Sequence, residues 1–270
     1  YFLLSGIHPW DDSRGLQPIL RKIKNDERPM NSGIIPSPFD KLIEECWSTN
    51  PLKRNSFITI LSKMGSSDFI RSIEDLDVSK FQAYQKKVVG HEFIKTVQIF
   101  SDRKRDEFEM KQFIGNGTFG HINLAIDKTN NNKVVCREIP SNYSDLFDKQ
   151  KKILSKMNFP SIISLYGFIE PDKEKKESLI LTPYAENGDL RSMIENENNE
   201  KAPTLWTYTQ KCIVIYGIAM GMYILHSYDI SHQDLKPENI LLNENLEPWI
   251  TDFSIANFVD SKQRIDQTLS

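Results

Sequence analysis

The feature that most constrains the fold of this chain is an apolar run from Cys212 to Leu225, which is interrupted only by glycines. At about a dozen residues, the run is shorter than the roughly 20 residues that a membrane-spanning helix needs. It therefore predicts a long, mostly buried helix over residues 205–227 and no membrane association. A helix that is apolar on all sides must be covered on all sides, so other parts of the chain have to pack around it.

The composition is that of an ordinary globular protein, with 39% hydrophobic and 26% charged residues in 270 positions. A formal net charge of −3 gives no reason to expect a surface for nucleic acid or for anionic membranes. The three cysteines, Cys46, Cys136 and Cys212, are an odd number at wide spacings. This pattern favours free thiols over a disulfide framework or a zinc site, so we expect a cytoplasmic protein.

Hydrophobic periodicity divides the chain into a helical start, a linker and a mixed region. Apolar residues recur at helical spacing over residues 39–47 and 57–64, and the helix-breaking pair Asn50–Pro51 separates the two. Near Phe108 the period changes to that of strands on either side of a glycine cluster. We predict strands around residues 113–114, 122–124, 134–136 and 178–181, helices over 144–157 and 205–227, and a partly helical linker before residue 107.

Two motifs near the end of the chain carry the strongest functional signal. Residues 231–242 read S-H-Q-D-L-K-P-E-N-I-L-L, and residues 251–254 read T-D-F-S. They resemble the catalytic loop H-R-D-x-K-x-x-N and the metal-binding loop D-F-G of the eukaryotic protein kinases. Phosphoryl transfer depends mainly on the placement of charge, and the resemblance implies that Asp234 meets the substrate hydroxyl while Asn239 and Asp252 hold Mg²⁺.

Each of these residues also has a simpler structural interpretation. His232 suits a core histidine, Asp252 a helix cap and Asn239 a turn residue. These two motifs and the glycine cluster at residues 115–120 occur in the order typical of the family, over about 140 residues. Together they favour the kinase interpretation over coincidence. Lys236 stands in a Lys-Pro-Glu-Asn sequence that resembles the serine/threonine form of the catalytic loop, which places it among the catalytic residues.

The glycine cluster reads G-N-G-T-F-G over residues 115–120 and resembles the kinase glycine-rich loop. Positions without a side chain let backbone N–H groups approach phosphate oxygens. Alone this motif is weak, because dinucleotide-binding proteins share G-x-G-x-x-G and many glycine-rich hairpins are only turns. Dinucleotide binding needs a helix directly after the loop, whereas a strand is predicted here. The resemblance then places Gly115, Gly117, Gly120 and Ile122 against the nucleotide.

Residues 181–188 read L-T-P-Y-A-E-N-G and resemble the hinge between the lobes of a kinase. The resemblance puts Thr182 at the back of the adenine pocket and adds Tyr184 to the nucleotide-binding residues. It implies ATP and Mg²⁺ as cofactors and a protein substrate or protein partner. It also implies an incomplete, two-lobed α+β fold, with a small antiparallel sheet lobe carrying one main helix and a mainly helical second lobe.

Two positions that interact in the family are altered together in this chain. The third strand of a kinase reads V-A-I-K, and its lysine contacts the ATP phosphates and pairs with a glutamate of the next helix. Here the strand ends in Arg137, and the glutamate position falls on Gln150, the polar member of an otherwise apolar helical stripe. A planar, bulkier guanidinium does not replace a lysine neutrally. Gln150 could still accept a hydrogen bond from Arg137 and so hold the helix inward.

Two further departures affect regulation rather than the metal ligands. Gln233 replaces the arginine that in the family receives an activation-loop phosphate, which argues against regulation by that route. Ser254 replaces the glycine after Asp252–Phe253 and should restrict rearrangement of that loop. Sequence drift with retained activity would explain all four changes as well.

Residues 1–64 resemble the last helices of a tyrosine-kinase-like C-lobe, above all through Cys46–Trp47 and a following Arg54. A C-terminal piece of one kinase would then precede a kinase-like domain over residues 107–270, with a linker over 65–106. This order indicates a tandem kinase cut at both ends or a permuted chain, and we favour the cut tandem because residues 266–270 stop in what looks like an extended loop. We expect residues 1–64 to pack on residues 107–270 and cover the apolar helix.

Three functions remain open on this evidence. A serine/threonine kinase of tyrosine-kinase-like type is favoured by the intact aspartates and asparagine. A pseudokinase that binds ATP or a protein partner without transferring phosphate is favoured by the altered pair. A helical scaffold without nucleotide requires the glycine cluster to be incidental.

Overall fold

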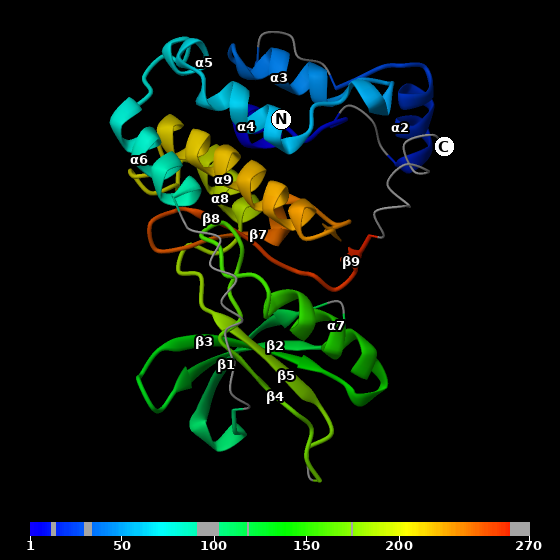
Figure 1. Cartoon of the computed structure of the whole chain (residues 1–270), viewed down its shortest axis with the longest axis vertical. Coiled ribbons are helices and arrows are strands. Elements are labelled where there is room, and N and C mark those ends of the chain that lie inside the picture. The colour runs from blue at the N-terminus through cyan, green and yellow to red at the C-terminus, as the bar shows by residue number, and fades with distance from the viewer. Residues whose placement is uncertain (12–14, 30–33, 91–102, 118, 174, 260–270) are drawn as a thin grey trace.

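A sheet lobe and a mainly helical lobe make up the protein (Figure 1). The computed structural model describes residues 1–11, 15–29, 34–90, 103–117, 119–173 and 175–259. Part of the predicted linker (91–102), Thr118 of the glycine cluster and the predicted extended end (266–270) lie outside the described residues. The arrangement confirms the two-lobed α+β fold that the resemblance implied.

The sheet lobe is a five-stranded antiparallel sheet with the strand order β1-β2-β3-β5-β4. Alternate residues of its strands face a small core in which Val134, Cys136 and Leu181 are fully buried. The register pairs Cys136 directly with Leu181 across the two central strands. The strands are β1 (Phe108–Asn116), β2 (His121–Asp127), β3 (Lys133–Ile139), β4 (Gly167–Ile169) and β5 (Ser178–Pro183).

One helix, α7 (Ser144–Leu154), packs against this sheet. Its apolar residues Phe147 and Ile153 are buried in one cluster with Ile139 and Ile180 of the strands. The helix ends at Leu154, three residues before the predicted end, and Met157 is buried in the segment that follows. The sheet lobe therefore carries the single main helix that the resemblance implied, preceded by the turns η2 (Arg105–Glu107) and η3 (Ser141–Tyr143).

The helical lobe is organised around α9 (Tyr208–Ser227), which is buried on most of its surface. It begins at Tyr208 rather than at the predicted residue 205, because the Thr207 hydroxyl accepts a hydrogen bond from the Gln210 N–H and caps the helix. No helix within the described residues is both long enough and apolar enough to span a membrane. Around α9 lie α8 (Leu190–Asn198), the turn η4 (Pro237–Asn239), and the strand pairs β6 (Ile230–Ser231) with β9 (Asn257–Phe258) and β7 (Ile240–Leu242) with β8 (Pro248–Ile250).

Helices from the start of the chain lie against the opposite side of α9 (Figure 1). Both predicted helices are present here, and α6 also contacts α9. One buried cluster joins residues of these helices, including Phe39, Met64 and Phe81, with Cys212 and Tyr216 of α9. The elements are α1 (Phe2–Ser5), α2 (Leu16–Lys24), α3 (Phe39–Cys46), η1 (Pro51–Lys53), α4 (Phe57–Gly65), α5 (Ser67–Arg71) and α6 (Val78–Val89).

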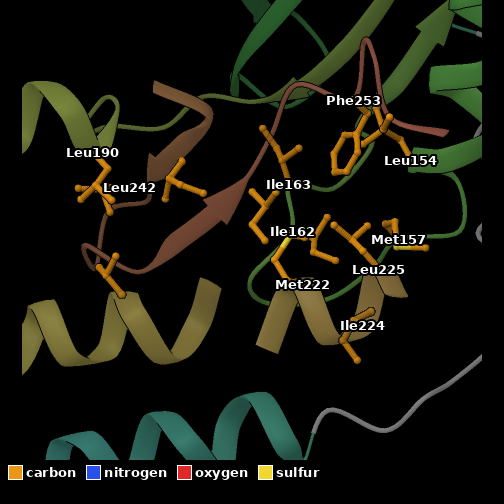
Figure 2. Packing of buried hydrophobic residues seen from close by; sticks show 14 of the residues in the cluster. Leu154, Met157, Ile162, Ile163, Leu190, Met222, Ile224, Leu225, Leu242 and Phe253 are labelled. Atoms are coloured by element: carbon orange, nitrogen blue, oxygen red, sulfur yellow. The ribbon is translucent and has the colours of Figure 1, made fainter. Parts of the chain in front are cut away.

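A second buried cluster joins residues of the helical lobe with residues of the sheet lobe. Figure 2 shows Met222 and Leu225 of α9 beside Ile162 and Met157, with Phe253 above them. Each fully buried aliphatic or aromatic side chain of this kind contributes roughly 1.5 to 3 kcal/mol relative to exposure. The cluster therefore fixes the position of the segment around Phe253, which carries part of the candidate site.

The close packing of α6 on α9 gives a direct test of this arrangement. A Cβ atom at Gly217 would lie 2.3 Å from the Tyr84 Oη and 2.5 Å from the Pro248 Cγ. Tyr84 is buried, and its hydroxyl is hydrogen-bonded to the Ser161 Oγ at 3.1 Å, so it has little freedom to move. We expect Gly217→Ala to lower the free energy of unfolding by about 1 to 3 kcal/mol, because overpacking outweighs the gain in helix propensity.

Gly65→Ala is the matched control, since the nearest atom to its new Cβ would be the Gln85 Nε2 at 3.9 Å. That variant should leave the stability unchanged or raise it by up to about 1 kcal/mol. Urea denaturation of both variants measures the difference. Equal stability of Gly217→Ala and the wild type would contradict the packing of α6 on α9.

Candidate active site

A cavity of about 600 Å³ lies between the two lobes. The wall on the side of the sheet lobe comes from β1, β2 and β3, and the rear comes from β5 and α7. The floor, on the side of the helical lobe, comes from η4, β7 and the segment after β8. Most of the site residues predicted from the sequence face this cavity. These are Gly117, Ile122, Arg137, Gln150, Thr182, Tyr184, Lys236, Asn239 and Asp252.

Three predicted site residues do not line the cavity itself. Gly115 lies in β1 opposite Ile122, and Gly120 lies just before β2. Asp234 sits at the edge of the floor, where its carboxylate is partly exposed to solvent. All three remain adjacent to residues that do face the cavity, through strand pairing or hydrogen bonds.

A short hydrogen-bond network holds the floor of the cavity together. The Asp234 Oδ2 accepts one bond from the Lys236 Nζ at 2.7 Å and another from the Asn239 Nδ2 at 2.9 Å. The Asn239 Nδ2 also donates to the Asp234 backbone carbonyl at 2.8 Å. Since the amide nitrogen of Asn239 is engaged in this way, its Oδ1 is the atom left for a ligand in the cavity.

His232 anchors this floor from below. Its side chain is buried against the Phe253 ring, with the two ring centroids 5.3 Å apart. The imidazole Nε2 lies 2.8 Å from the Thr251 carbonyl oxygen, to which it can donate, and its Nδ1 then accepts from the Asp234 backbone N–H at 3.3 Å. His232 is therefore a buried core histidine with both ring nitrogens in hydrogen bonds.

Asp252 stands opposite, bound to a residue from the other lobe. The Arg137 Nη1 of β3 donates to the Asp252 Oδ1 at 2.7 Å. Asp252 itself adopts a left-handed backbone conformation with φ of 61°, which is uncommon for a residue with a side chain. This ion pair links the sheet lobe to the loop at the back of the cavity.

Gln150 does not take part in that interaction. Its side chain is buried on α7 and lines the cavity, but among the described residues no hydrogen bond joins it to Arg137. The expectation that Gln150 accepts a bond from Arg137 is therefore wrong for this conformation. The guanidinium carries a full charge, and a carboxylate attracts it more strongly than a neutral amide does.

The glycine cluster forms a tight turn between β1 and β2, closed by a hydrogen bond from the Gly117 N–H to the Gly120 carbonyl at 2.8 Å. A Cβ atom at Gly120 would lie only 2.0 Å from the Glu138 carbonyl oxygen of β3. The backbone can therefore approach β3 this closely only because residue 120 has no side chain. The ring of Phe119 lies 5.1 Å from the ring of Tyr143, on the turn before α7.

The predicted hinge lies at the end of β5. Thr182 pairs with Val135 in the sheet, and both residues face the cavity. The Lys133 Nζ lies over the Tyr184 ring at 5.5 Å from its centroid. Apolar side chains and a few polar groups at this end suit a planar, heteroaromatic ligand.

Neighbouring charges shift the titration of the acidic groups. The hydrogen bond from Lys236 is the largest influence on Asp234 and lowers its pKa. Burial on its own raises the pKa of Asp252, but the charge and hydrogen bond of Arg137, together with hydrogen bonds from Ser254, outweigh burial and lower the pKa. Burial lowers the pKa of His232, so its imidazole is neutral near neutral pH. Both carboxylates are therefore ionised at neutral pH.

These donors fit a nucleotide and a hard divalent cation. The Asn239 Oδ1 and the Asp252 carboxylate are oxygen ligands of the kind that Mg²⁺ prefers. No cluster of three or more His, Cys, Asp or Glu side chains that could hold a metal ion occurs in the described part of the chain. A metal ion here would thus complete its shell with phosphate oxygens and water, which is the usual arrangement for Mg²⁺.

Sequence reasoning missed one pair at the mouth of the cavity. Glu238 lines the cavity and accepts a hydrogen bond from the Arg191 Nη1 of α8 at 2.7 Å. The Lys-Pro-Glu-Asn motif contained Glu238, but nothing in the local sequence indicated a partner 47 positions earlier. The pair is largely exposed and so contributes little to stability.

Comparison with known proteins agrees with the resemblance to kinases that the sequence motifs indicated. A family model described as "Protein kinase domain" matches residues 108–270. The chain is 33% identical over 151 residues to a tyrosine-protein kinase receptor, svh-2, of Caenorhabditis elegans, and 32% identical over 158 residues to a probably inactive leucine-rich repeat receptor-like protein kinase of Arabidopsis thaliana. It is 31% identical over 156 residues to the MAP kinase kinase kinase SSK2 of Saccharomyces cerevisiae. These matches cover 54 to 55% of the chain but only 9 to 15% of the relatives.

The Arg137–Asp252 pair predicts a defined response to pH. The pKa of Asp252 is lowered in the folded protein, so the pair stabilises the fold above the unfolded-state pKa and loses that effect as the pH falls through the folded-state pKa. We expect Arg137→Gln to raise the pKa of Asp252, because burial is then opposed by the hydrogen bonds from Ser254 but no longer by the charge of Arg137. Carboxyl ¹³C chemical shifts followed against pH measure this change.

Lys236→Gln is the control, because it should raise the pKa of Asp234 and leave that of Asp252 much less affected. An unchanged Asp252 titration in Arg137→Gln would show that the ion pair is absent in solution.

Proposed function

The chain belongs to the protein kinase family, and on this premise we propose that it binds ATP between its lobes and transfers phosphate to serine or threonine of a protein substrate. The observation that carries the proposal is the convergence of Asp234, Asn239 and Asp252 around one cavity whose opposite wall contains the glycine-rich turn. The three residues and the glycine-rich turn come from different lobes and lie more than 100 positions apart in the chain, so chance proximity does not explain the arrangement.

The floor of the cavity supports a specific division of roles. Asp234 would orient the hydroxyl of the substrate, because its carboxylate is ionised and partly exposed at the edge of the cavity. Asn239 fixes the position of Asp234 through its amide nitrogen and, with Asp252, would hold Mg²⁺. When bound, Mg²⁺ neutralises phosphate charge during transfer. Lys236 places a positive charge beside Asp234, where negative charge from the phosphate would develop.

The residues on the sheet-lobe side of the cavity favour nucleotide binding. Gly115, Gly117 and Gly120 are three positions without a side chain around the connection from β1 to β2, and Gly117 and Ile122 line the cavity. Thr182, Tyr184 and Arg137 all line the cavity, and we propose that the first two contact the adenine ring and that Arg137 contacts the phosphates. Serine/threonine specificity rests on the sequence around Lys236, and the tyrosine-kinase-like group rests on the resemblance of residues 1–64.

A pseudokinase is the second candidate, and two observations favour it. Arg137 is bound to Asp252 rather than standing free for a phosphate, and Gln150 provides no carboxylate for a replacement ion pair. One of the relatives is itself named as probably inactive. In this function the cavity would bind ATP, or the protein would bind a partner, without phosphate transfer.

We also propose that residues 1–64, the linker 65–106 and the kinase-like domain 107–270 act as one unit. Support comes from the buried cluster in which Leu61 and Met64 of α4 meet Ile213 and Ala219 of α9. In this proposal the early helices complete the helical lobe that the kinase-like domain needs. The cytoplasmic location stays a prediction, although Cys46, Cys136 and Cys212 are all free thiols as expected.

Nucleotide binding can be tested with a matched pair of glycine variants. We expect Mg-ATP to raise the melting temperature of the wild type, and Gly120→Ala to abolish most of that increase because its Cβ would displace the turn from Glu138. Gly65→Ala should keep the increase, since Gly65 does not line the cavity and the nearest atom to its new Cβ would be the Gln85 Nε2 at 3.9 Å. No shift with any nucleotide would favour the helical scaffold without a nucleotide site.

Phosphate transfer needs a separate measurement with radiolabelled ATP and a serine/threonine-containing protein substrate. We expect Asp234→Asn to reduce the rate by about 10² or more, because the hydroxyl loses its proton acceptor. Asp148→Asn, an exposed position of α7, should transfer phosphate at the wild-type rate.

A clear Mg-ATP shift without any transfer by the wild type would instead select the pseudokinase. The double variant Arg137→Lys with Gln150→Glu then identifies the cause. A large gain in transfer would show that the altered pair limits activity, whereas no gain would place the limit elsewhere.

A further inference from the structure

The cavity contains an ion pair that no single lobe could form. Arg137 lies on β3 and Asp252 lies 115 positions later, and their side chains are 22% and 15% exposed. Both side chains are thus largely shielded from bulk water. In such a shielded position, two charges attract each other more strongly than at the open surface. The pair connects a residue proposed to contact the phosphates with a residue proposed to hold the metal.

Arg137 has no other anionic partner among the described residues. Gln150, at the position where the family has a glutamate, is neutral and makes no hydrogen bond to it. The remaining cation in the cavity, Lys236, is already paired with Asp234 at 2.7 Å. The guanidinium of Arg137 therefore supplies the local counter-charge for Asp252.

We propose that Arg137 and a divalent metal ion compete for Asp252, so that nucleotide enters this cavity without a metal ion. Metal then binds only when Arg137 moves away from the carboxylate. This inference rests on the proposed nucleotide binding and concerns how that same site depends on metal.

The chemistry of the residues explains both halves of the proposal. An arginine stays protonated at any accessible pH, so it neutralises Asp252 permanently and removes the repulsion that a free carboxylate would exert on phosphates. A metal ion, by contrast, needs that carboxylate, because the other ligand is the neutral amide of Asn239. Displacing a 2.7 Å charge-assisted hydrogen bond weakens the affinity for the metal.

The experiment is a titration of the full chain with a fluorescent ATP analogue, once in EDTA and once in excess Mg²⁺. The dissociation constants of the wild type are expected to agree within about threefold between the two conditions. Arg137→Gln is expected to bind at least about tenfold more weakly in EDTA and to regain affinity in Mg²⁺, because Asp252 becomes free for the metal. Asp252→Asn should keep its metal-free affinity, since Arg137 then faces the phosphates alone.

Lys111→Gln is the matched control for the loss of one positive charge, because Lys111 lies on β1 outside the cavity and forms an ion pair with Glu109. It should behave like the wild type in both buffers. Circular dichroism and the melting temperature establish that each variant is folded before titration. Binding of Mn²⁺ in the presence of the analogue, followed by electron paramagnetic resonance, should be tighter in Arg137→Gln than in the wild type.

Three results would overturn the inference. A wild type that binds at least about tenfold more tightly in Mg²⁺ than in EDTA would show that metal, not Arg137, provides the counter-charge. Equal weakening of Arg137→Gln in both conditions would show that Arg137 is only a phosphate contact. Either result leaves the proposed nucleotide binding standing, whereas the absence of binding in both buffers would reject that function and the inference together.

Discussion

The burial of α9 is the constraint on which the rest of the structure depends. One side of this helix joins the buried cluster of the kinase-like domain through Val214, Met222 and Leu225, and the other joins a cluster built from residues 35–88. Because the helix is apolar around its circumference, neither side can face water without a large cost in free energy. The early helices and α6 thereby cover the side of α9 that faces away from the cavity.

The Arg137–Asp252 ion pair connects the two lobes across the cavity, and apolar packing connects them beneath the cavity floor. The Arg137–Asp252 pair spans from β3 to the loop after β8, while Phe253 next to it is buried in the core between the lobes. Asp252 is thus positioned from both sides, by an ion pair above and by its neighbour below. Such positioning matters for phosphoryl transfer, which depends on the placement of charges more than on covalent chemistry.

Much of the candidate site could be predicted because its residues lie in short motifs with fixed spacing. Asp234 and Asn239 are five positions apart on one loop, and the structure joins them by a hydrogen bond at 2.9 Å. The partner of Arg137 could not be predicted in the same way. Local sequence indicated Gln150, at the position of the family's glutamate, whereas the choice between an amide and a carboxylate depends on which of them the folded lobes bring within reach of the guanidinium.

Sequence alone was enough to predict strands around the glycine cluster, a buried helix over residues 205–227, and the acids and amide of the two motifs. Periodicity and motif spacing are local properties, so one chain segment at a time contains them. The packing of Tyr84 over Gly217 and the pairing of Arg137 with Asp252 became visible in the folded chain. Those contacts join residues more than 100 positions apart, and their formation depends on how whole elements pack rather than on any local pattern.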